Sequence, residues 1–354
     1  MDIEKRTELV KRNAEELVTD SELTELLSKN GVPTAYIGFE PSGLVHLGWA
    51  MVASKICDLA EAGFNVTVYW ADWHAYINDK LGSDIDNIRT CARYMEDCFE
   101  ALGVPKDKVR YAYASELLDD IDYWEVVIKI AKVTSLSRVK RAMTIMGRSE
   151  DEAEVDSSKL FYPILQAADI FRLGVDLAYA GMDQRKAHML ARDAAERLGW
   201  KKPMALHTPL LPGLKGGDRM NPEASKMSKS DPDSSVNIHD DDESVRRKLS
   251  KAFCPPEKEA ENENPVLMLC KHVVLPRTGT LFIERPEKFG GNVSFNTYEE
   301  ISSSYFSGKL HPMDLKKGVA EGLIKALAPV RSFFSSKPEN LDAIRDVLKR
   351  SGKL

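Results

Sequence analysis

Cysteine is scarce in this chain, and no apolar run is long enough to suggest a membrane span. Only five of the 354 residues are cysteines, and none of them stands in a Cys-x-x-Cys pair. This scarcity argues against a disulfide framework and against a structural zinc site, and it favours a reducing, cytoplasmic setting. The N-terminus is charged and lacks the apolar core of a secretory signal. The composition is that of a globular protein with room for two domains.

An overall excess of positive charge, which nucleic-acid-binding proteins often carry, is also missing. The formal net charge is −6. It is unevenly spread, because residues 305–354 hold ten Lys and Arg against five Asp and Glu, a net +5 that leaves −11 on the rest. A basic C-terminal segment on an acidic body could follow a phosphate backbone. A solvated helical face is the simpler interpretation of the same charges.

Apolar, β-branched runs alternate with helical patterns in the first third of the chain. Strands are predicted at residues 35–39, 65–72 and 109–115, with helices between them at about 46–62 and 84–102. This rhythm predicts an α/β fold with a Rossmann-like parallel sheet. Further helical stretches are expected at 122–146 and 184–198, with an acidic surface connection at 149–158.

The pattern stops at residues 213–235, which are rich in Gly, Ser, Pro and Lys and predict a long loop. A mostly helical region follows, broken near Gly290. We therefore expect a helical N-terminal arm at 1–30, a Rossmann-like domain with a helical insertion at 31–235, and a C-terminal domain at 236–354.

The stretch His46-Leu47-Gly48-Trp49 stands where a predicted helix begins. The unpaired amides and partial positive charge of a first helical turn suit a phosphate group. His46 can donate to phosphate oxygens, and Gly48 lets a ligand approach the backbone closely. Trp49 stands where a second histidine would complete a nucleotide motif; its indole N–H can donate but carries no charge. Taken alone, a histidine at a helix start is more often incidental.

The segment Lys226-Met227-Ser228-Lys229-Ser230 is a stronger signal. Two lysines on a loop can close over a triphosphate and stabilise the charge that develops on the leaving pyrophosphate. A solvated Lys/Ser loop is the alternative. The joint occurrence of this segment with the earlier helix-start motif is a pattern that chance seldom produces.

With these motifs the chain resembles the class I aminoacyl-tRNA synthetases, and closely the tyrosyl-tRNA synthetases of the archaeal and eukaryotic type. The resemblance covers nearly the full length, apart from roughly the first 30 and the last 20 residues. It rests on the stretches AYIGFEPSG, ADWHAY, YPILQAADI, GMDQRKAHMLAR, KMSKS, RPEKFGG and HPMDLK. It implies that the C-terminal domain is a mostly helical anticodon-binding domain.

The stretch YPILQAADI also predicts a pocket by itself. Tyr162, Gln166 and Asp169 follow one another at helical spacings i, i+4 and i+7, so they project from one side of an otherwise apolar helix. The resemblance implies that Tyr162 and Gln166, with Gln184, hold the α-ammonium group of the substrate. It implies that Asp169 and Tyr36 bind its phenol hydroxyl.

Such a pair of polar groups would explain selection of tyrosine. Phenylalanine would leave both groups unpaired, and sites of this kind reject the analogue without the hydroxyl by roughly 10⁴–10⁵, a figure that comes from tyrosyl-tRNA synthetases themselves. No editing domain is then required. Tryptophan remains the competing amino acid within this subclass, but Tyr36 together with Asp169 favours tyrosine.

The resemblance implies further roles around the sheet. Gly38 would pass beneath the amino acid, and His74 would be a wall of the tyrosine pocket, although a buried core histidine is as good an interpretation. The resemblance implies catalytic roles for His46, Lys226 and Lys229. The expected ATP-binding residues are His46, Gly48, Gly181, Asp183, Lys226, Met227, Ser228 and Lys229.

Two groups of residues are expected to contact tRNA. Arg138, Lys140, Arg141 and Arg148 lie in a predicted helical region that could bind the acceptor stem, with a solvated helix face as the equal alternative. Phe289, His311 and Asp314 match the anticodon-reading positions of the family. Without the resemblance, Asp314 would be read as a favourable charge in the first turn after Pro312.

We therefore predict a tyrosine–tRNA ligase, a cytoplasmic homodimer joined through its helical insertion, with tRNA-Tyr, tyrosine and ATP as substrates. Mg²⁺ is expected to arrive with ATP, held by phosphates and water, with no protein-bound metal. The alternatives are a catalytically silent paralogue that binds tRNA, a nucleotidyltransferase without an RNA substrate, and a tryptophanyl enzyme.

Overall fold

The structure is a computed structural model that describes residues 1–147, 156–216 and 234–352. Its centre is a six-stranded sheet in the order β1-β6-β5-β2-β3-β4. Every neighbouring pair is parallel except β1 and β6, which run antiparallel. The strands are β1 (Glu16–Val18), β2 (Thr34–Phe39), β3 (Asn65–Trp70), β4 (Val109–Tyr113), β5 (Leu177–Gly181) and β6 (Met204–Thr208).

The predicted Rossmann-like parallel sheet is confirmed, and its three predicted strands correspond to β2, β3 and β4. The last two are shorter than predicted, because Asp72 and Ala114 already begin helices. The sequence analysis did not predict β1, β5 or β6. Because β5 returns to pair with β2 rather than with β4, the strand order reverses between β2 and β5. Open α/β sheets bind ligands at such a switch point, beyond the carboxyl ends of the strands.

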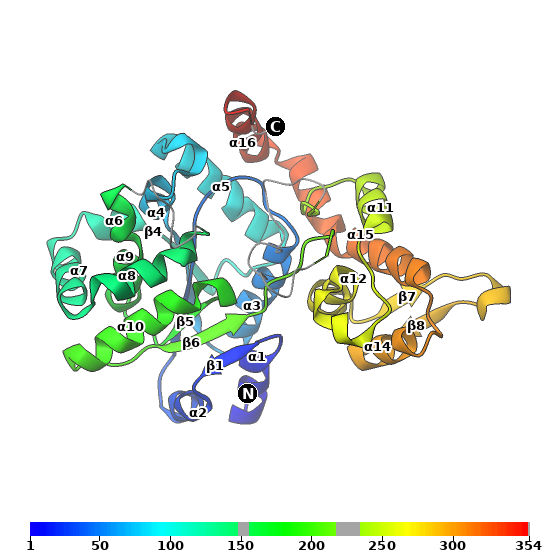
Figure 1. Ribbon diagram of the computed structural model, residues 1–354, viewed down its shortest axis with the longest axis horizontal. Coiled ribbons are helices and arrows are strands. Elements are labelled where there is room, and N and C mark those ends of the chain that lie inside the picture. Colours follow the sequence, from blue (N-terminus) through cyan, green and yellow to red (C-terminus); the bar gives the residue numbers. More distant parts are fainter. Residues whose placement is uncertain (148–155, 217–233, 353–354) are drawn as a thin grey trace.

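Helices cover both faces of the sheet (Figure 1). Successive residues of a strand point to opposite faces, so Ile37 belongs to one buried cluster and Tyr36 to another. The helices that precede residue 217 are α1 (Ile3–Lys11), α2 (Asp20–Ser28), α3 (Gly48–Glu61), α4 (Asp72–Ile77), α5 (Ile85–Ala101), α6 (Ala114–Leu118), α7 (Ile121–Val133), α8 (Leu136–Ala142), α9 (Tyr162–Arg172) and α10 (Arg185–Leu198).

The helical stretch expected at 122–146 is broken into separate pieces. The helix α7 ends at Val133, and Thr134 is extended, with φ −111° and ψ 125°. Ser135 then caps α8, because its side chain accepts the N–H of Arg138. A serine cap following a β-branched residue is a local stop and start signal that a continuous helical pattern conceals.

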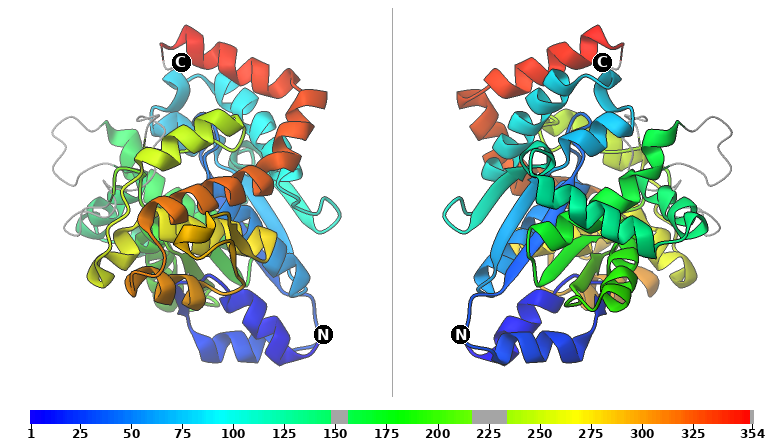
Figure 2. Two further views of the ribbon diagram at one scale, coloured as in Figure 1. Left: turned by 90° about the vertical axis from the view of Figure 1, so that its right-hand side faces the viewer. Right: turned by 90° about the vertical axis from the view of Figure 1, so that its left-hand side faces the viewer.

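The C-terminal part is mostly helical, as predicted, but it contains an unpredicted antiparallel hairpin of β7 (Leu281–Ile283) and β8 (Val293–Phe295). The 25-residue helix α15 packs on this hairpin, and its end approaches α5 (Figures 1 and 2). A Cβ on Gly318 would lie 2.6 Å from Ile283, so glycine permits that close packing. The remaining helices are α11 (Asp242–Lys251), α12 (Pro265–Leu269), α13 (Leu275–Thr278), α14 (Tyr298–Phe306), α15 (Pro312–Ser336) and α16 (Glu339–Arg350).

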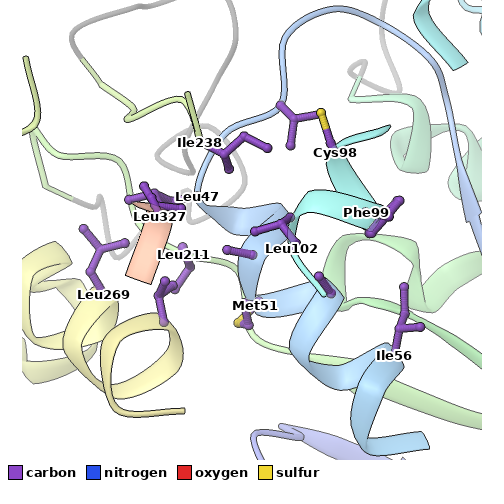
Figure 3. Packing of buried hydrophobic residues seen from close by; sticks show 14 of the residues in the cluster. Leu47, Met51, Ile56, Cys98, Phe99, Leu102, Leu211, Ile238, Leu269 and Leu327 are labelled. Atoms are coloured by element: carbon purple, nitrogen blue, oxygen red, sulfur yellow. The ribbon is translucent and has the colours of Figure 1, made fainter. Parts of the chain in front are cut away.

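One hydrophobic cluster joins the two parts. Leu47 directly before α3, Met51 of α3, Phe99 of α5, Leu269 of α12 and Leu327 of α15 belong to it (Figure 3). The C-terminal part therefore packs on the face of the sheet that α3 covers. Among the helices of the described ranges, none is both long and apolar enough to cross a membrane.

Candidate active site

The carboxylate of Asp169 is the centre of a buried polar cluster on α9. It is 1% exposed. The hydroxyls of Tyr69 and Tyr123 donate to its Oδ1 at 2.9 and 2.8 Å, and His74 Nε2 lies 3.2 Å from its Oδ2. These partners come from β3, α7 and α4, so three separate elements orient one acceptor.

Tyr36 lies in the same cluster. Its ring meets that of Tyr69 edge to face, with the centroids 6.2 Å apart. Burial and the nearby Asp169 carboxylate raise the pKa of the Tyr36 hydroxyl, so it remains a neutral donor and acceptor. The structure thus brings Tyr36 and Asp169 together, and a phenol hydroxyl placed between them would find both partners.

His74 connects Asp169 to the second part of the cluster. Its ring meets Tyr162 edge to face at 5.0 Å. Burial by itself would lower the pKa of His74, but the charges of Asp169, Glu40 and Asp72 outweigh burial, and the pKa is raised. His74 is therefore a buried histidine that lies beside Asp169 and Tyr162, and its role as a wall of the tyrosine pocket stays a prediction.

Tyr162 begins α9 and is held by a carboxylate at the end of β2. Its hydroxyl donates to Glu40 Oε1 at 2.6 Å, and Asn78 Nδ2 donates to the same carboxylate at 2.9 Å. Gln166, one turn further along α9, donates from Nε2 to Gln184 Oε1 at 3.3 Å, and Gln184 donates to the carbonyl of Ile145 at 3.0 Å.

Gln166 Oε1 is buried and accepts no hydrogen bond from the described part of the chain. A buried acceptor of this kind suits an ammonium group. Tyr162, Gln166 and Asp169 thus all face partners across one side of α9, as their spacing predicts. Glu40, Tyr69 and Tyr123 were not identified from the sequence, because their contacts with this helix are made by the tertiary fold.

Two predicted site glycines, Gly38 for tyrosine and Gly181 for ATP, lie at neighbouring strand ends. Gly38 is near the end of β2, and a Cβ there would lie 3.4 Å from the ring of Tyr36. Gly181 ends β5, and its Cβ would lie 2.8 Å from Asp183 Oδ1. Both glycines therefore flank the switch point between β2 and β5.

His46 lies just before α3. Its Nδ1 accepts the N–H of Gly48 at 3.1 Å, which leaves the ring proton on Nε2 as a donor. A Cβ on Gly48 would lie 2.8 Å from the imidazole, so the missing side chain makes room for His46 itself. Lys226, Met227, Ser228 and Lys229 fall outside the described residues.

Trp49 packs as part of an aromatic group. Its ring stacks on Phe39 with the centroids 4.5 Å apart, and it also approaches Phe99 at 5.9 Å. This contact with β2 and α5 gives the tryptophan a packing role at a position where we expected a possible phosphate donor.

The predicted tRNA residues are distributed over two surfaces. On α8, Arg138 pairs with Asp193 at 2.8 Å, whereas Lys140 and Arg141 are exposed. Arg138 and Arg141 line a hollow of about 440 Å³. Arg148, in the same sequence stretch, lies outside the described ranges.

At the far end of the C-terminal part, Phe289 is 59% exposed and Lys288 Nζ lies 4.9 Å from its ring centroid. His311 caps α15, because its Nδ1 accepts the N–H of Met313 at 3.2 Å. Asp314 is in the first turn after Pro312, which confirms its interpretation as a helix-start charge. Its contact with a base remains a prediction.

Comparison with known proteins relates this geometry to one family. Residues 28–328 match the family model described as tRNA synthetases class I (W and Y). The protein named Tyrosine–tRNA ligase from Aeropyrum pernix is 49% identical over 350 residues, which covers 96% of this chain and 95% of that protein. Its namesake from Sulfolobus acidocaldarius is 47% identical over 359 residues and covers 99% of each chain.

A solved structure is also similar. The crystal structure of tyrosyl-tRNA synthetase complexed with L-tyrosine from Pyrococcus horikoshii superimposes with a TM-score of 0.90 at 44% sequence identity. The superposition covers 98% of this chain and 100% of the Pyrococcus horikoshii chain.

Proposed function

The chain belongs to the class I tRNA synthetases and, within them, to the tyrosine–tRNA ligases, and we infer from this premise that the switch-point site carries out both steps of the reaction. Tyrosine reacts with ATP to give tyrosyl-adenylate and pyrophosphate. A hydroxyl of the terminal ribose of tRNA-Tyr then attacks the carbonyl carbon of the adenylate, which forms the tyrosyl ester and releases AMP. The tryptophanyl alternative is thereby set aside.

The observation that carries this function is the buried Asp169 beside Tyr36. We assign the phenol hydroxyl of tyrosine to these two residues. We assign its α-ammonium group to Tyr162, Gln166 and Gln184, where the buried Gln166 Oε1 supplies an acceptor. This arrangement would fix the amino acid with its carboxylate toward the nucleotide side of the switch point.

The chemistry requires no covalent enzyme intermediate. The substrate carboxylate attacks the α-phosphorus of ATP, the bond to the bridging oxygen breaks, and pyrophosphate leaves with the electron pair. We propose that His46 Nε2 and the first turn of α3 stabilise the charge on the phosphates, together with Lys226 and Lys229. Gly38, Gly48, Gly181 and Asp183 would bind the adenylate.

Mg²⁺ would enter with ATP. In the described parts of the chain, no group of three or more acidic, His or Cys side chains is arranged around a common point. We propose that phosphate oxygens and water hold this ion, and that its charge neutralises the triphosphate.

We further propose a homodimer formed through the helical insertion. Ile121 and Ile128 of α7 are 79% and 66% exposed and stand seven residues apart on one side of the helix, with Leu136 60% exposed nearby in sequence. Sedimentation analysis of Ile128→Glu tests this assignment, because a charge in the interface should give monomers. We place the enzyme in the cytoplasm, where tRNA is charged for translation.

The test of the function is tyrosine-dependent exchange of labelled pyrophosphate into ATP without tRNA, with tryptophan and phenylalanine as controls. Exchange with tyrosine alone is the expected result, and it would also show that Trp49 is compatible with activation. A folded protein that gives no exchange with any of the three would contradict the function and favour a silent tRNA-binding paralogue.

A further inference from the structure

Residues 234–240, here called the return segment, lie along the chain that carries His46. The N–H of Leu47 donates to the carbonyl of Val236 at 2.9 Å, and the N–H of Ile238 donates to the carbonyl of Val45 at 3.0 Å. These bonds flank an antiparallel bridge between His46 and Asn237. The position of His46 is therefore tied to the return segment.

A single buried hydroxyl bonds to both sides of this pairing. Tyr94 of α5 is fully buried. Its oxygen accepts the N–H of Val45 at 3.1 Å and lies 3.0 Å from Nε2 of His239. Tyr94 thus contacts the residue directly before His46 and the return segment at once.

The protonation states suit this arrangement. Burial lowers the pKa of His239 to about 4, and the charge of Arg345 contributes in the same direction. Burial raises the pKa of Tyr94 well above its ordinary value. At neutral pH a neutral imidazole can accept the hydroxyl proton while the phenol oxygen accepts the Val45 amide.

The C-terminal part holds the same point from the other side. Phe334 of α15 packs against the rings of Tyr94 and His239, with centroids 5.9 and 6.3 Å away. Lys248 of α11 donates to the carbonyl of Ser235 at 2.9 Å and to Asp240 at 2.8 Å. Figure 3 shows that Leu47 and Ile238 lie in the cluster that includes Leu327 of α15.

We propose that Tyr94 and His239 are positioning residues for tyrosine activation, which hold His46 and the start of α3 in place against the return segment. This inference rests on the proposed function. Neither residue reaches the tyrosine cluster around Asp169, which lies with the other buried cluster of the sheet. Their loss should therefore misplace the phosphate-binding side of the site and leave the tyrosine side intact.

Tyr94→Phe removes the hydroxyl and keeps the ring. It leaves the Val45 N–H and His239 Nε2 without their common partner. Because a misplacement of about 1 Å can reduce a rate about 10²-fold, we expect kcat for tyrosine-dependent pyrophosphate exchange to fall by about 10- to 100-fold. KM for tyrosine should stay within about twofold, since its binding groups are unchanged.

Two controls separate positioning from general destabilisation. Tyr305→Phe removes a similarly buried hydroxyl, one that bonds to the carbonyls of Cys254 and Pro255 in the C-terminal part, and should leave exchange unchanged. His239→Leu removes one of the two bonds of Tyr94 and should cause part of the loss seen in Tyr94→Phe, whereas His239→Gln keeps an acceptor and should restore most of kcat. The double variant that combines Tyr94→Phe with His239→Leu should be no worse than Tyr94→Phe alone, because Tyr94→Phe already removes the bond to His239.

Hydrogen exchange of the backbone provides a readout that does not require activity. Amide protection at residues 45–47 and 236–238 should fall at least about 10-fold in Tyr94→Phe but not in Tyr305→Phe. Unchanged protection, or a kcat equal to that of Tyr305→Phe, would overturn the positioning role. Absence of exchange activity in the parent protein would instead contradict the proposed function, while the protection measurement still decides the role of Tyr94.

Discussion

The predicted tyrosine pocket and the predicted anticodon end are built in opposite ways. Asp169 is 1% exposed and has partners from three elements, whereas Phe289 is 59% exposed at the tip of a hairpin. In the predicted pocket, hydrogen bonds from other elements of the fold hold the side chains of Asp169 and Tyr162 in place. At the predicted anticodon end, the exposed ring of Phe289 is accessible to an unpaired base of an RNA loop.

This difference has a physical cause. A small amino acid is recognised by enclosure, where an unpaired polar group is costly and selectivity is correspondingly high. An unpaired base of an RNA loop is recognised by stacking on an exposed ring. Changes in the pocket should therefore affect chemistry and stability together, and changes at the anticodon end should affect tRNA use alone.

The largest effect is expected from Asp169→Asn. The asparagine side chain has no negative charge and one acceptor oxygen fewer than the carboxylate. Tyr69, Tyr123 and His74 contact that carboxylate, and the substrate phenol is proposed to do so. We expect kcat/KM for tyrosine to fall by about 10²–10³, equivalent to about 3–4 kcal/mol, with a lower melting temperature. Pyrophosphate exchange measures the first and thermal unfolding the second.

Asp58→Asn is the matched control for this change. Asp58 is also buried, at 5% exposure, and pairs with Arg12 and Lys55 on the opposite side of the sheet. It should lose stability with little change in kcat/KM. An equal loss of activity in both variants would mean that Asp169 acts only through folding.

A smaller and more selective effect is expected from Phe289→Ala. Loss of one stacking platform should reduce kcat/KM for tRNA-Tyr by about 10-fold, in line with about 1–3 kcal/mol per stacked base. Tyrosine-dependent exchange and melting temperature should not change. Phe282→Ala, which removes a ring of similar exposure (54%) from β7, is the control and should charge tRNA normally. Equal losses in both would favour a general role of the hairpin.

The smallest effect on activity is expected from a buried charge outside either site. Lys55 is 1% exposed and donates to the carbonyls of Leu9 and Val10, at the end of α1. Burial, only partly offset by Asp58, lowers its pKa to about 8 from 10.5. The unfolded chain therefore binds more protons between these values, and stability should rise with pH across that window.

Relative to Lys55→Met, the free energy of unfolding of the parent should increase by up to about 3 kcal/mol between pH 7 and 10.5. Urea denaturation at several pH values measures this difference. A difference that does not vary with pH would show that Lys55 keeps its ordinary pKa. The catalytic activity of Lys55→Met at pH 8 should be close to that of the parent. The buried charge of Lys55 would then affect stability alone, whereas the buried charge of Asp169 affects activity as well.

Much of the fold and part of the candidate site could be predicted from local patterns. The strands β2, β3 and β4 and the helices between them follow from periodicity, and so does the common side of Tyr162, Gln166 and Asp169 on α9. The strands β5 and β6 were missed although both are short buried runs, and β1 has only three residues. The break between α7 and α8 was missed because a helical pattern continues on both sides of Thr134.

The sequence by itself determined the family, through motifs spread over nearly its full length, and it placed the polar stripe of α9 through a spacing that any helix imposes. Only the tertiary structure decided what that stripe faces. The return of β5 to β2 brings Tyr69 within 2.9 Å of Asp169, one hundred residues later in the chain. Likewise Tyr94 meets His239 only because the C-terminal part packs on α5. Periodicity is a local property of the backbone, whereas these partners are selected by chain crossover and packing, which no short stretch of sequence contains.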